Sequence, residues 1–211
     1  SSDSKLHGTF TDMMTGSATM LIEYAYDYCA IAPTFIHLSN FFQREVKLPW
    51  IFSRQQFYKN DQQLQDKVTT YLKDLYDESN RNFDKLKYLN LTGIDISNKS
   101  LSIAKECLYN AFLDENVELI KQDSTQYTPE QTKEGLLFAN PPYGIRLGED
   151  EKLDELYHNF GENLKHSFKG STAFIISGNM EKIKKISLRT SKKIIVWNGN
   201  LECRLVQYDL F

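Results

Sequence analysis

The hydrophobic residues of the chain fall into short apolar runs that are separated by longer amphipathic segments. The apolar runs are typical of buried strands. They cover residues 6–11, 88–97, 117–121, 135–139, 172–177, 193–197 and 201–210. The amphipathic segments predict helices over residues 20–31, 62–77, 98–111, 153–168 and 180–188, with Ser97 as the N-cap of the third. This alternation predicts an α/β fold with a doubly wound, mostly parallel sheet.

The last two strands are expected to be connected differently from the others. Asn198-Gly199 separates them, and this dipeptide is the strongest short-range signal for a tight β-hairpin turn. The sequence therefore predicts a mostly parallel seven-stranded sheet that finishes in an antiparallel hairpin.

Residues 32–88 form a long segment between the first helix and the second strand. The segment is far too long for a simple βαβ crossover, so we expect a helical insertion within a single domain spanning residues 1–211. The predicted helix at 62–77 has one apolar stripe. The stripe consists of Leu64, Val68, Tyr71, Leu72 and Leu75. The simplest interpretation of the insertion is an elaborated flank of the core, and the second is a substrate groove lined by Arg44, Arg54 and Lys59.

The composition limits the classes of protein to which the chain can belong. Its 211 residues are 41% hydrophobic and 13% aromatic, which excludes disorder and predicts a substantial core. No apolar run is long enough to span a membrane, and the first residues do not resemble a signal peptide. The Ser-Ser-Asp-Ser start, which leads almost directly into a strand, is expected of an excised domain or a tag remnant. Cys29, Cys107 and Cys203 are widely spaced, so we expect reduced thiols of a cytoplasmic protein and no metal site.

The charge of the chain is unevenly distributed. A net charge of −3 argues against tight binding of nucleic acid by this chain alone, because non-specific affinity rises with the number of neutralised phosphates. Residues 165–193, however, contain eight Lys or Arg residues and Glu181 as the one acid. The simpler interpretation is a solvated helix face, and the alternative is a surface that faces phosphates.

A glycine-containing turn follows the first predicted strand. It reads Asp12-Met13-Met14-Thr15-Gly16-Ser17-Ala18-Thr19 and leads into a helix. Strand, glycine turn and helix N-terminus open a nucleotide-binding α/β unit, in which a cofactor approaches the backbone closely. An ordinary helix N-cap at Ser17 or Thr19 would explain the turn almost as well.

Polar residues also end the second and third predicted strands. Asp95 lies at the end of the second strand, where a carboxylate is the usual partner of ribose hydroxyls because it accepts two hydrogen bonds at once. Its alternative role is to cap the following helix. Asp123 follows the third strand and would accept a hydrogen bond from an adenine amine, while the backbone N–H of Ser124 donates to the ring. The alternative for Asp123 is an ordinary Asx turn.

The stretch after the fourth predicted strand has the most specific pattern in the chain. The apolar run 135–139 is followed by Asn140-Pro141-Pro142-Tyr143. The prolines cannot continue a ladder and they fix φ, so the chain must turn rigidly here. Such a turn would hold the Asn140 amide and nearby carbonyls as fixed acceptors beside the flat Tyr143 ring, which suits a planar base with an exocyclic amine. The alternative is a Pro-rich turn with a packed tyrosine.

Together these motifs resemble the amino-terminal methyltransferase domain of the large-subunit (23S) ribosomal RNA guanine-N2 methyltransferases of the RlmL type. The similarity covers nearly the whole chain, the long insertion included. It rests on Asp12…Gly16-Ser17, Gly93-x-Asp95, Asn140-Pro141-Pro142-Tyr143-Gly144-x-Arg146-Leu147-Gly148 and Asn198-Gly199-x-Leu201-Glu202-Cys203. The resemblance implies a Rossmann-like class I fold, S-adenosylmethionine as methyl donor, and N2 of a guanine in 23S ribosomal RNA as acceptor.

The resemblance also implies a role for each motif residue. Asp12, Gly16 and Ser17 would lie by the methionine end of the cofactor, Asp95 would hold the ribose, and Asp123 with Ser124 would hold the adenine. The catalytic set would be Asn140, Pro141, Pro142 and Tyr143. Asn140 and the Pro141 carbonyl would receive the target amine, Tyr143 would stack on the flipped base, and Asn140 would also border the cofactor.

Some features depart from the family pattern. Relatives have Asp-Pro-x-Cys-Gly-Ser-Gly where this chain has Met13, Thr15 and Ala18. The backbone must pass close to the cofactor at Ala18, so its extra methyl is expected to weaken cofactor binding. The family has an upstream RNA-binding THUMP domain, so we expect ribosomal RNA to be held by this domain together with that one. The alternatives are methylation of adenine N6 in DNA, methylation of guanine N2 in transfer RNA, or a non-catalytic RNA-binding relative.

Overall fold

The computed structural model describes residues 8–44, 46–129, 134–142 and 150–211. These residues fall into two compact units, one formed by residues 1–22 with 89–211 and the other by residues 23–88. We call them the sheet unit and the inserted unit, and each is described by itself. Within the described ranges no helix combines the length and apolar character needed to cross a bilayer.

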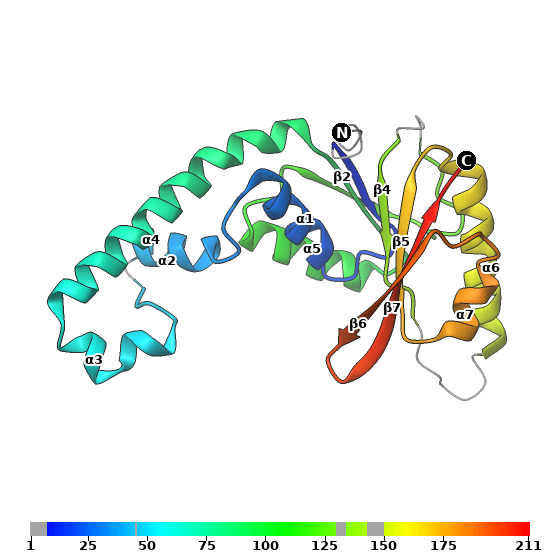
Figure 1. The fold of residues 1–211 in the computed structure, drawn as a ribbon. Helices are drawn as coiled ribbons and strands as arrows, with labels where there is room; N and C mark the ends of the chain where they lie inside the picture. Colours follow the sequence, from blue (N-terminus) through cyan, green and yellow to red (C-terminus); the bar gives the residue numbers. More distant parts are fainter. Residues whose placement is uncertain (1–7, 45, 130–133, 143–149) are drawn as a thin grey trace. The chain divides into compact units, whose positions relative to one another are not determined.

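The sheet unit is built on a single seven-stranded sheet (Figure 1). Its strands are β1 (Thr9–Asp12), β2 (Asn90–Asp95), β3 (Val117–Lys121), β4 (Leu136–Ala139), β5 (Thr172–Ser177), β6 (Lys192–Asn198) and β7 (Leu201–Asp209). They lie in the order β3-β2-β1-β4-β5-β7-β6, with β1 to β5 parallel and β7 antiparallel to both of its neighbours. The predicted α/β fold, with a parallel sheet and a final antiparallel hairpin, is confirmed.

Helices cover both faces of this sheet. In the view of Figure 1, α5 (Asn98–Asn110) lies on one face, and α6 (Asp150–Ser167) and α7 (Met180–Lys185) lie on the other. A large group of buried side chains lies between the sheet and α6. It includes Leu137, Ile175, Val206 and Tyr208 from the strands and Tyr157, Phe160 and Leu164 from α6. Burial of this apolar surface is the main stabilising contribution to the unit.

The hairpin turn begins one residue later than the Asn198-Gly199 signal implies. Asn198 pairs with Leu201, so Gly199 and Asn200 are the two central residues. Gly199 has a φ of +61°, which is the left-handed region that type II′ turns require at their first central position.

The helices differ from the predictions mainly at their ends. The first helix, α1 (Thr19–Cys29), stops before residue 31 because Ala30 has a φ of +57°, and α7 stops at Lys185 because Ser187 has the same φ. Helix α4 (Gln62–Asn82) runs past residue 77, since the Ser79 hydroxyl accepts a hydrogen bond from the Ala32 N–H at 3.0 Å and so anchors the last turns. Such long-range contacts are not visible in a local sequence pattern.

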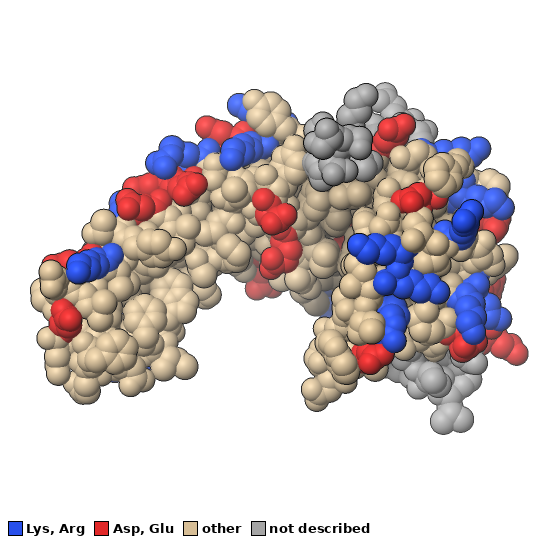
Figure 2. Space-filling model, in the orientation of Figure 1, with Lys and Arg blue, Asp and Glu red and all other residues tan. Residues whose placement is uncertain are grey.

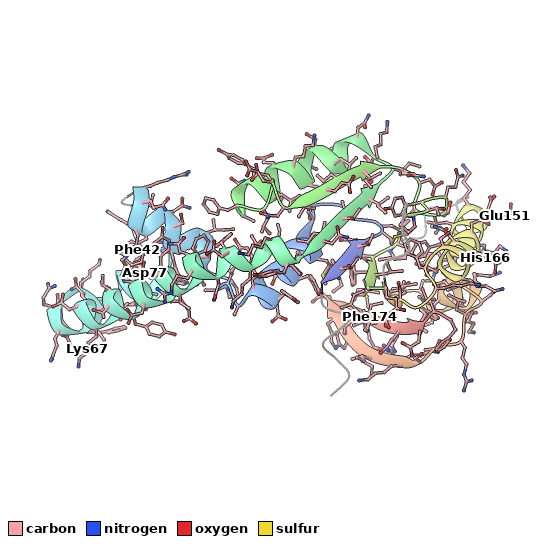
Figure 3. The ribbon with its side chains drawn as sticks, turned by 90° about the horizontal axis from the view of Figure 1, so that it is seen from above. Phe42, Lys67, Asp77, Glu151, His166 and Phe174 are labelled. Atoms are coloured by element: carbon pink, nitrogen blue, oxygen red, sulfur yellow. The ribbon has the colours of Figure 1, made fainter. Side chains whose placement is uncertain are left out.

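The inserted unit contains α2 (Phe35–Arg44), α3 (Gln56–Lys59), α4 and the 3-10 helices η2 (Ile51–Arg54) and η3 (Phe83–Tyr88). Rings hold α2 against α4: the Tyr76 ring lies 5.5 Å from the Phe35 ring and 5.4 Å from the Phe42 ring. Figure 3 shows Phe42 and Asp77 close to each other, and Lys73 lies between them, over the Phe42 ring and 2.7 Å from the Asp77 carboxylate.

The buried stripe of α4 differs from the predicted one. Leu72, Tyr76 and Ser79 are buried, whereas Tyr71 is 66% exposed. The prediction placed Tyr71 on the apolar stripe, but the α2 contact lies on the Leu72–Tyr76 side of the helix and leaves Tyr71 in solvent.

Candidate functional site

The glycine turn after β1 is clamped between the two neighbouring strands. The Met13 N–H donates to the Phe138 carbonyl of β4 at 2.8 Å, and the Thr15 N–H donates to the Ile94 carbonyl of β2 at 2.9 Å. In the sheet register Asp12 lies opposite Phe138 on one side and Gly93 on the other. The turn is therefore fixed at the carboxyl edge of the sheet, where ligands bind in folds of this kind.

Asp95 joins the turn after β1 to the start of α5. Its Oδ2 accepts a hydrogen bond from the Gly16 N–H at 3.0 Å, and its Oδ1 accepts one from the Ser97 N–H at 2.8 Å. Ser97, as predicted, is the N-cap of α5 and accepts from the Ser100 N–H at 3.3 Å. A carboxylate has about four acceptor positions, so both oxygens of Asp95 keep capacity for ligand hydroxyls.

Asp12 is a buried carboxyl at the centre of this edge. It is 2% exposed, and the Met14 N–H donates to its Oδ1 at 3.3 Å. Burial raises the pKa of Asp12 to about 7; the Met14 and Thr15 contacts lower it in part, and the charge of Asp95 raises it further. No ion pair among the described residues reaches Asp12. An unpaired buried carboxylate is costly, so this site favours a ligand that brings a positive charge.

Gly16 and Ala18 face different surroundings. Gly16 has a φ of +53°, and a methyl group added to it would meet no atom within 4 Å, so open space lies beside this backbone. Ala18 has a φ of +62° but no exposed surface. Its methyl therefore lies inside the protein and does not enter the space beside Gly16, although it replaces the second glycine of the usual motif.

The loop after β3 is held by α6. Asp123 Oδ1 accepts from both the N–H and the hydroxyl of Thr125, at 2.9 and 2.8 Å, which is the Asx-turn geometry. Ser124 is buried, and its carbonyl accepts from the Asn163 side chain at 2.8 Å, as the Tyr127 carbonyl does at 2.9 Å. The Asx turn uses one oxygen of Asp123 and leaves the other for a ligand.

Asn140 follows β4 directly, and its side chain is exposed at the same edge of the sheet. Pro141 is buried and Pro142 is exposed. The Pro142 carbonyl accepts a hydrogen bond from the Tyr157 hydroxyl at 3.4 Å, and this hydroxyl lies 3.1 Å from the buried Ser177 hydroxyl at the end of β5. The turn is thereby tied to α6 and to the neighbouring strand. Tyr143 lies outside the described residues.

Tyr157 and Ser177 were not singled out by the sequence. Tyr157 occupies an apolar position of an amphipathic helix and is 1% exposed, so the pattern alone describes it as an ordinary core residue. Ser177 is the last residue of an apolar strand. A positioning role is revealed only by the contact of Tyr157 with the Pro142 carbonyl and by the contact of Ser177 with the Tyr157 hydroxyl.

Many cations of residues 165–193 have acidic partners. The buried Lys182 lies 2.6 Å from Asp154, and Lys185 lies 2.8 Å from the same carboxylate. Lys184 pairs with Glu181 and Lys165 with Glu162. Figure 2 shows Lys or Arg and Asp or Glu side chains on the visible face of the sheet unit. Four of the eight cations are therefore paired with three acidic side chains, which neutralises part of this positive charge and weakens the interpretation as a phosphate-facing surface.

A pocket of about 590 Å³ lies apart from the strand-end residues. Thr11, Thr92, Ile120 and Leu137 are among its lining residues, whereas Asp12, Asp95, Asp123 and Asn140 are not. Within the described residues there is also no group of three or more His, Cys, Asp or Glu that could hold a metal ion, and the three cysteines are free thiols.

Sequence comparison places the chain in a family of methyltransferase domains. The family model of the RMKL-like methyltransferase domain (UPF0020) matches residues 1–207. Two curated relatives are ribosomal RNA large subunit methyltransferases K/L. The one from Methylococcus capsulatus is 30% identical to this chain over 203 residues, and the one from Shewanella frigidimarina is 31% identical over 208 residues. Each alignment covers 96% of this chain, and 25% and 26% of the respective relative. The chain thus spans about a quarter of the length of these relatives.

Solved structures show the same fold. SMU.472, described as a putative methyltransferase complexed with SAH, matches with a TM-score of 0.74 and 25% identity over 100% of this chain and 50% of that one. A possible methylase from Clostridium difficile 630 matches with a TM-score of 0.73 and 24% identity over the same shares. The fold is that of the S-adenosylmethionine-dependent methyltransferases, and the chain belongs to the RMKL-like methyltransferase domain family.

Proposed function

We propose that this domain transfers a methyl group from S-adenosylmethionine to the exocyclic N2 amine of a guanine in 23S ribosomal RNA. The observation that carries the proposal is the convergence of Asp12, Asp95, Asp123 and Asn140 at one edge of the sheet, at the ends of four neighbouring strands. The named K/L relatives and the SAH complex of SMU.472 support the same donor and the same class of acceptor.

The described residues fit the cofactor. Open space lies beside the Gly16 backbone, as close approach of a ligand requires. The buried Asp12 carboxylate suits the ammonium of the methionine end, and Asp95 keeps acceptor positions for the ribose hydroxyls. Asp123 and the Ser124 N–H would hold the adenine. When bound, S-adenosylmethionine supplies a methyl group that is electrophilic because it is attached to a sulfonium.

Asn140 is the residue that we assign to the target amine. The amine of guanine is a poor nucleophile, since its lone pair is delocalised into the ring. Acceptance of its N–H bonds by the Asn140 side chain and the Pro141 carbonyl would localise this lone pair and orient it for in-line displacement. The hydrogen bond from the Tyr157 hydroxyl to the Pro142 carbonyl already holds the turn before substrate binds, so the turn would not have to reorganise during the reaction. Tyr143 would stack on the extruded base.

The test is Asn140→Ala, with Asn110→Ala at the exposed end of α5 as matched control. Transfer of labelled methyl to unmodified 23S ribosomal RNA should fall about 100-fold or more in Asn140→Ala. Its affinity for S-adenosylhomocysteine, measured by calorimetry, should stay within about twofold of the starting chain, because Asn140 contributes little to the cofactor. Equal loss of affinity and transfer would contradict the assignment of Asn140.

The identity of the acceptor atom is read from the product. Nucleoside analysis should show N2-methylguanosine. N6-methyladenine, or methyl transfer only to transfer RNA, would keep the enzyme class and overturn the proposed acceptor. Binding of S-adenosylhomocysteine without transfer to any nucleic acid, in the full-length protein, would favour the non-catalytic alternative.

A further inference from the structure

The segment between α2 and α4 has an unusual composition. We call its residues 46–60 the aromatic tip; they contain three cations, four aromatic rings and no acid. The cations are Lys47, Arg54 and Lys59, and the rings are Trp50, Phe52, Phe57 and Tyr58. Glu45 precedes the tip and lies outside the described residues. Asp61 follows it and caps α4, accepting from the Leu64 N–H at 2.9 Å. The tip is thus positively charged in a chain whose net charge is −3.

Two of the four rings of the aromatic tip, Phe52 and Phe57, lie on the surface together with Ile51 and the three cations. Ile51 is 75% exposed, Phe57 63% and Phe52 36%, and all three cations are exposed. Apolar side chains of this size are usually buried, because each stabilises the fold when it leaves water. Three large apolar side chains exposed within residues 51–57 mark an interaction surface rather than scattered exposure.

The aromatic tip is held in one conformation. The Ser53 hydroxyl donates to the Trp50 carbonyl at 2.7 Å, and the Gln65 side chain of α4 donates to the carbonyls of Tyr58 and Lys59 at 2.9 and 3.1 Å. The buried Tyr58 lies edge-on to Phe52 at 5.3 Å. Rings that are already ordered lose little conformational entropy when a ligand binds, so their surface can contribute its full contact energy.

Two of these rings are parallel. The centroids of Trp50 and Phe52 lie 6.2 Å apart with an interplanar angle of 10°. Parallel aromatic faces near exposed cations are the two components with which proteins hold unpaired nucleotides: bases stack on the rings, and phosphates meet the cations. Every base has such a face, so this mode of binding needs no particular sequence, but it needs the base to be unpaired.

We propose that the aromatic tip binds single-stranded RNA. This inference depends on the proposed function in one respect, namely that the nucleic acid is RNA. The absence of an acid within residues 46–60 favours a polyanion over a protein partner, because a phosphate chain meets no repulsion there. Half of the eight cations of residues 165–193 are, by contrast, already paired with acidic side chains, so they are less available to phosphates. The tip would hold an unpaired strand of the RNA substrate.

The binding test uses the whole chain and a labelled oligouridylate of about 12 nucleotides, followed by fluorescence anisotropy. Phe57→Ala should weaken binding about tenfold, which is the loss expected for one stacked base. Tyr71→Ala is the matched control, since Tyr71 is 66% exposed on α4 of the same unit but lies outside the tip. Arg54→Gln should reduce the salt dependence of log Kd by about 0.7, the value for one phosphate of a single strand.

A direct readout comes from the tryptophans. The chain has two, Trp50 in the tip and Trp197 on β6, which is 65% exposed. In a Trp197→Phe variant the intrinsic fluorescence reports Trp50 alone, and stacking of uracil bases should quench it as RNA is added. A perfectly paired RNA duplex of the same length should bind more weakly and leave the fluorescence unchanged.

Three results would overturn the proposal. One is binding of the oligouridylate without quenching of Trp50, the second is equal loss of affinity in Phe57→Ala and Tyr71→Ala, and the third is no binding at all, which would leave the tip to a protein partner. Unchanged affinity for S-adenosylhomocysteine, measured in Phe57→Ala, Tyr71→Ala and Arg54→Gln alike, verifies that the sheet unit is folded in each variant. Because that affinity tests the cofactor site separately, failure of the tip and failure of the proposed function are distinguishable.

Discussion

Asp12 is expected to oppose the stability of the folded protein at alkaline pH. Its pKa is about 7 in the folded chain and 3.8 when the carboxyl is in water. The folded state therefore retains a proton that the unfolded state releases between these two values, and each pH unit in that interval lowers the free energy of unfolding by about 1.4 kcal/mol. Below pH 3.8 both states are protonated, and above pH 7 both are ionised, so the whole loss falls within this window.

The perturbation that removes this effect is Asp12→Asn, which keeps the shape and the acceptor for the Met14 N–H. At pH 8.5 the variant should be more stable than the starting chain by about 4 kcal/mol, and at pH 5 by roughly 1.5 kcal/mol. Thermal unfolding of both proteins across this range is the assay. The difference in Tm should widen by roughly 5–10 °C between pH 5 and 8.5. A difference in Tm that stays constant would refute a buried carboxyl with a raised pKa.

The same carboxylate links stability to ligand binding. If Asp12 meets the ammonium of the cofactor, only its ionised form binds well, so affinity for S-adenosylhomocysteine should rise about tenfold per pH unit up to about pH 7 and then level off. Asp12→Asn should lose this dependence and bind about tenfold or more weakly at pH 8. A variant that gains stability but loses the ligand would identify Asp12 as a residue kept for binding at the expense of stability.

Three further substitutions test the surroundings of the site. Ala18→Gly should leave the affinity for S-adenosylhomocysteine within about twofold. It should change the free energy of unfolding by less than about 1 kcal/mol, because relief of the φ of +62° offsets the loss of a buried methyl. A large gain in affinity would show that this methyl does meet the cofactor. Gly93→Ala should destabilise by about 1–3 kcal/mol in urea unfolding, since its new methyl would lie 2.8 Å from the Thr15 hydroxyl. Tyr157→Phe removes the hydroxyl that donates to the Pro142 carbonyl, so it should lower the free energy of unfolding by about 1 kcal/mol. It should also lower kcat and leave the cofactor affinity unchanged. An unchanged kcat would argue against a positioning role of Tyr157.

Local sequence patterns were sufficient to predict the bounds of an element where turn-forming residues directly flank it. The strands at 117–121 and 172–177 have the predicted bounds, since each is a short apolar run followed by polar or glycine residues. Helix ends were less predictable. The anchoring of Ser79 extended α4 through a contact 47 residues away in the chain, and positive φ values at Ala30 and Ser187 shortened α1 and α7. Distant contacts and backbone strain leave no signal in hydrophobic periodicity.

The sequence by itself determined the order of the elements and the chemistry at the strand ends. Parallel strands joined by crossovers must place their carboxyl ends at one edge, so Asp12, Asp95 and Asn140 could be grouped from their positions alone. The tertiary structure decided the rest: that Asp95 binds the Gly16 N–H across 79 residues, and that Tyr157 fixes the Pro142 carbonyl. Burial likewise decided the raised pKa of Asp12 and the inward methyl of Ala18. Hydrogen bonds and desolvation depend on which distant groups surround an atom, and a linear pattern of residues does not contain that information.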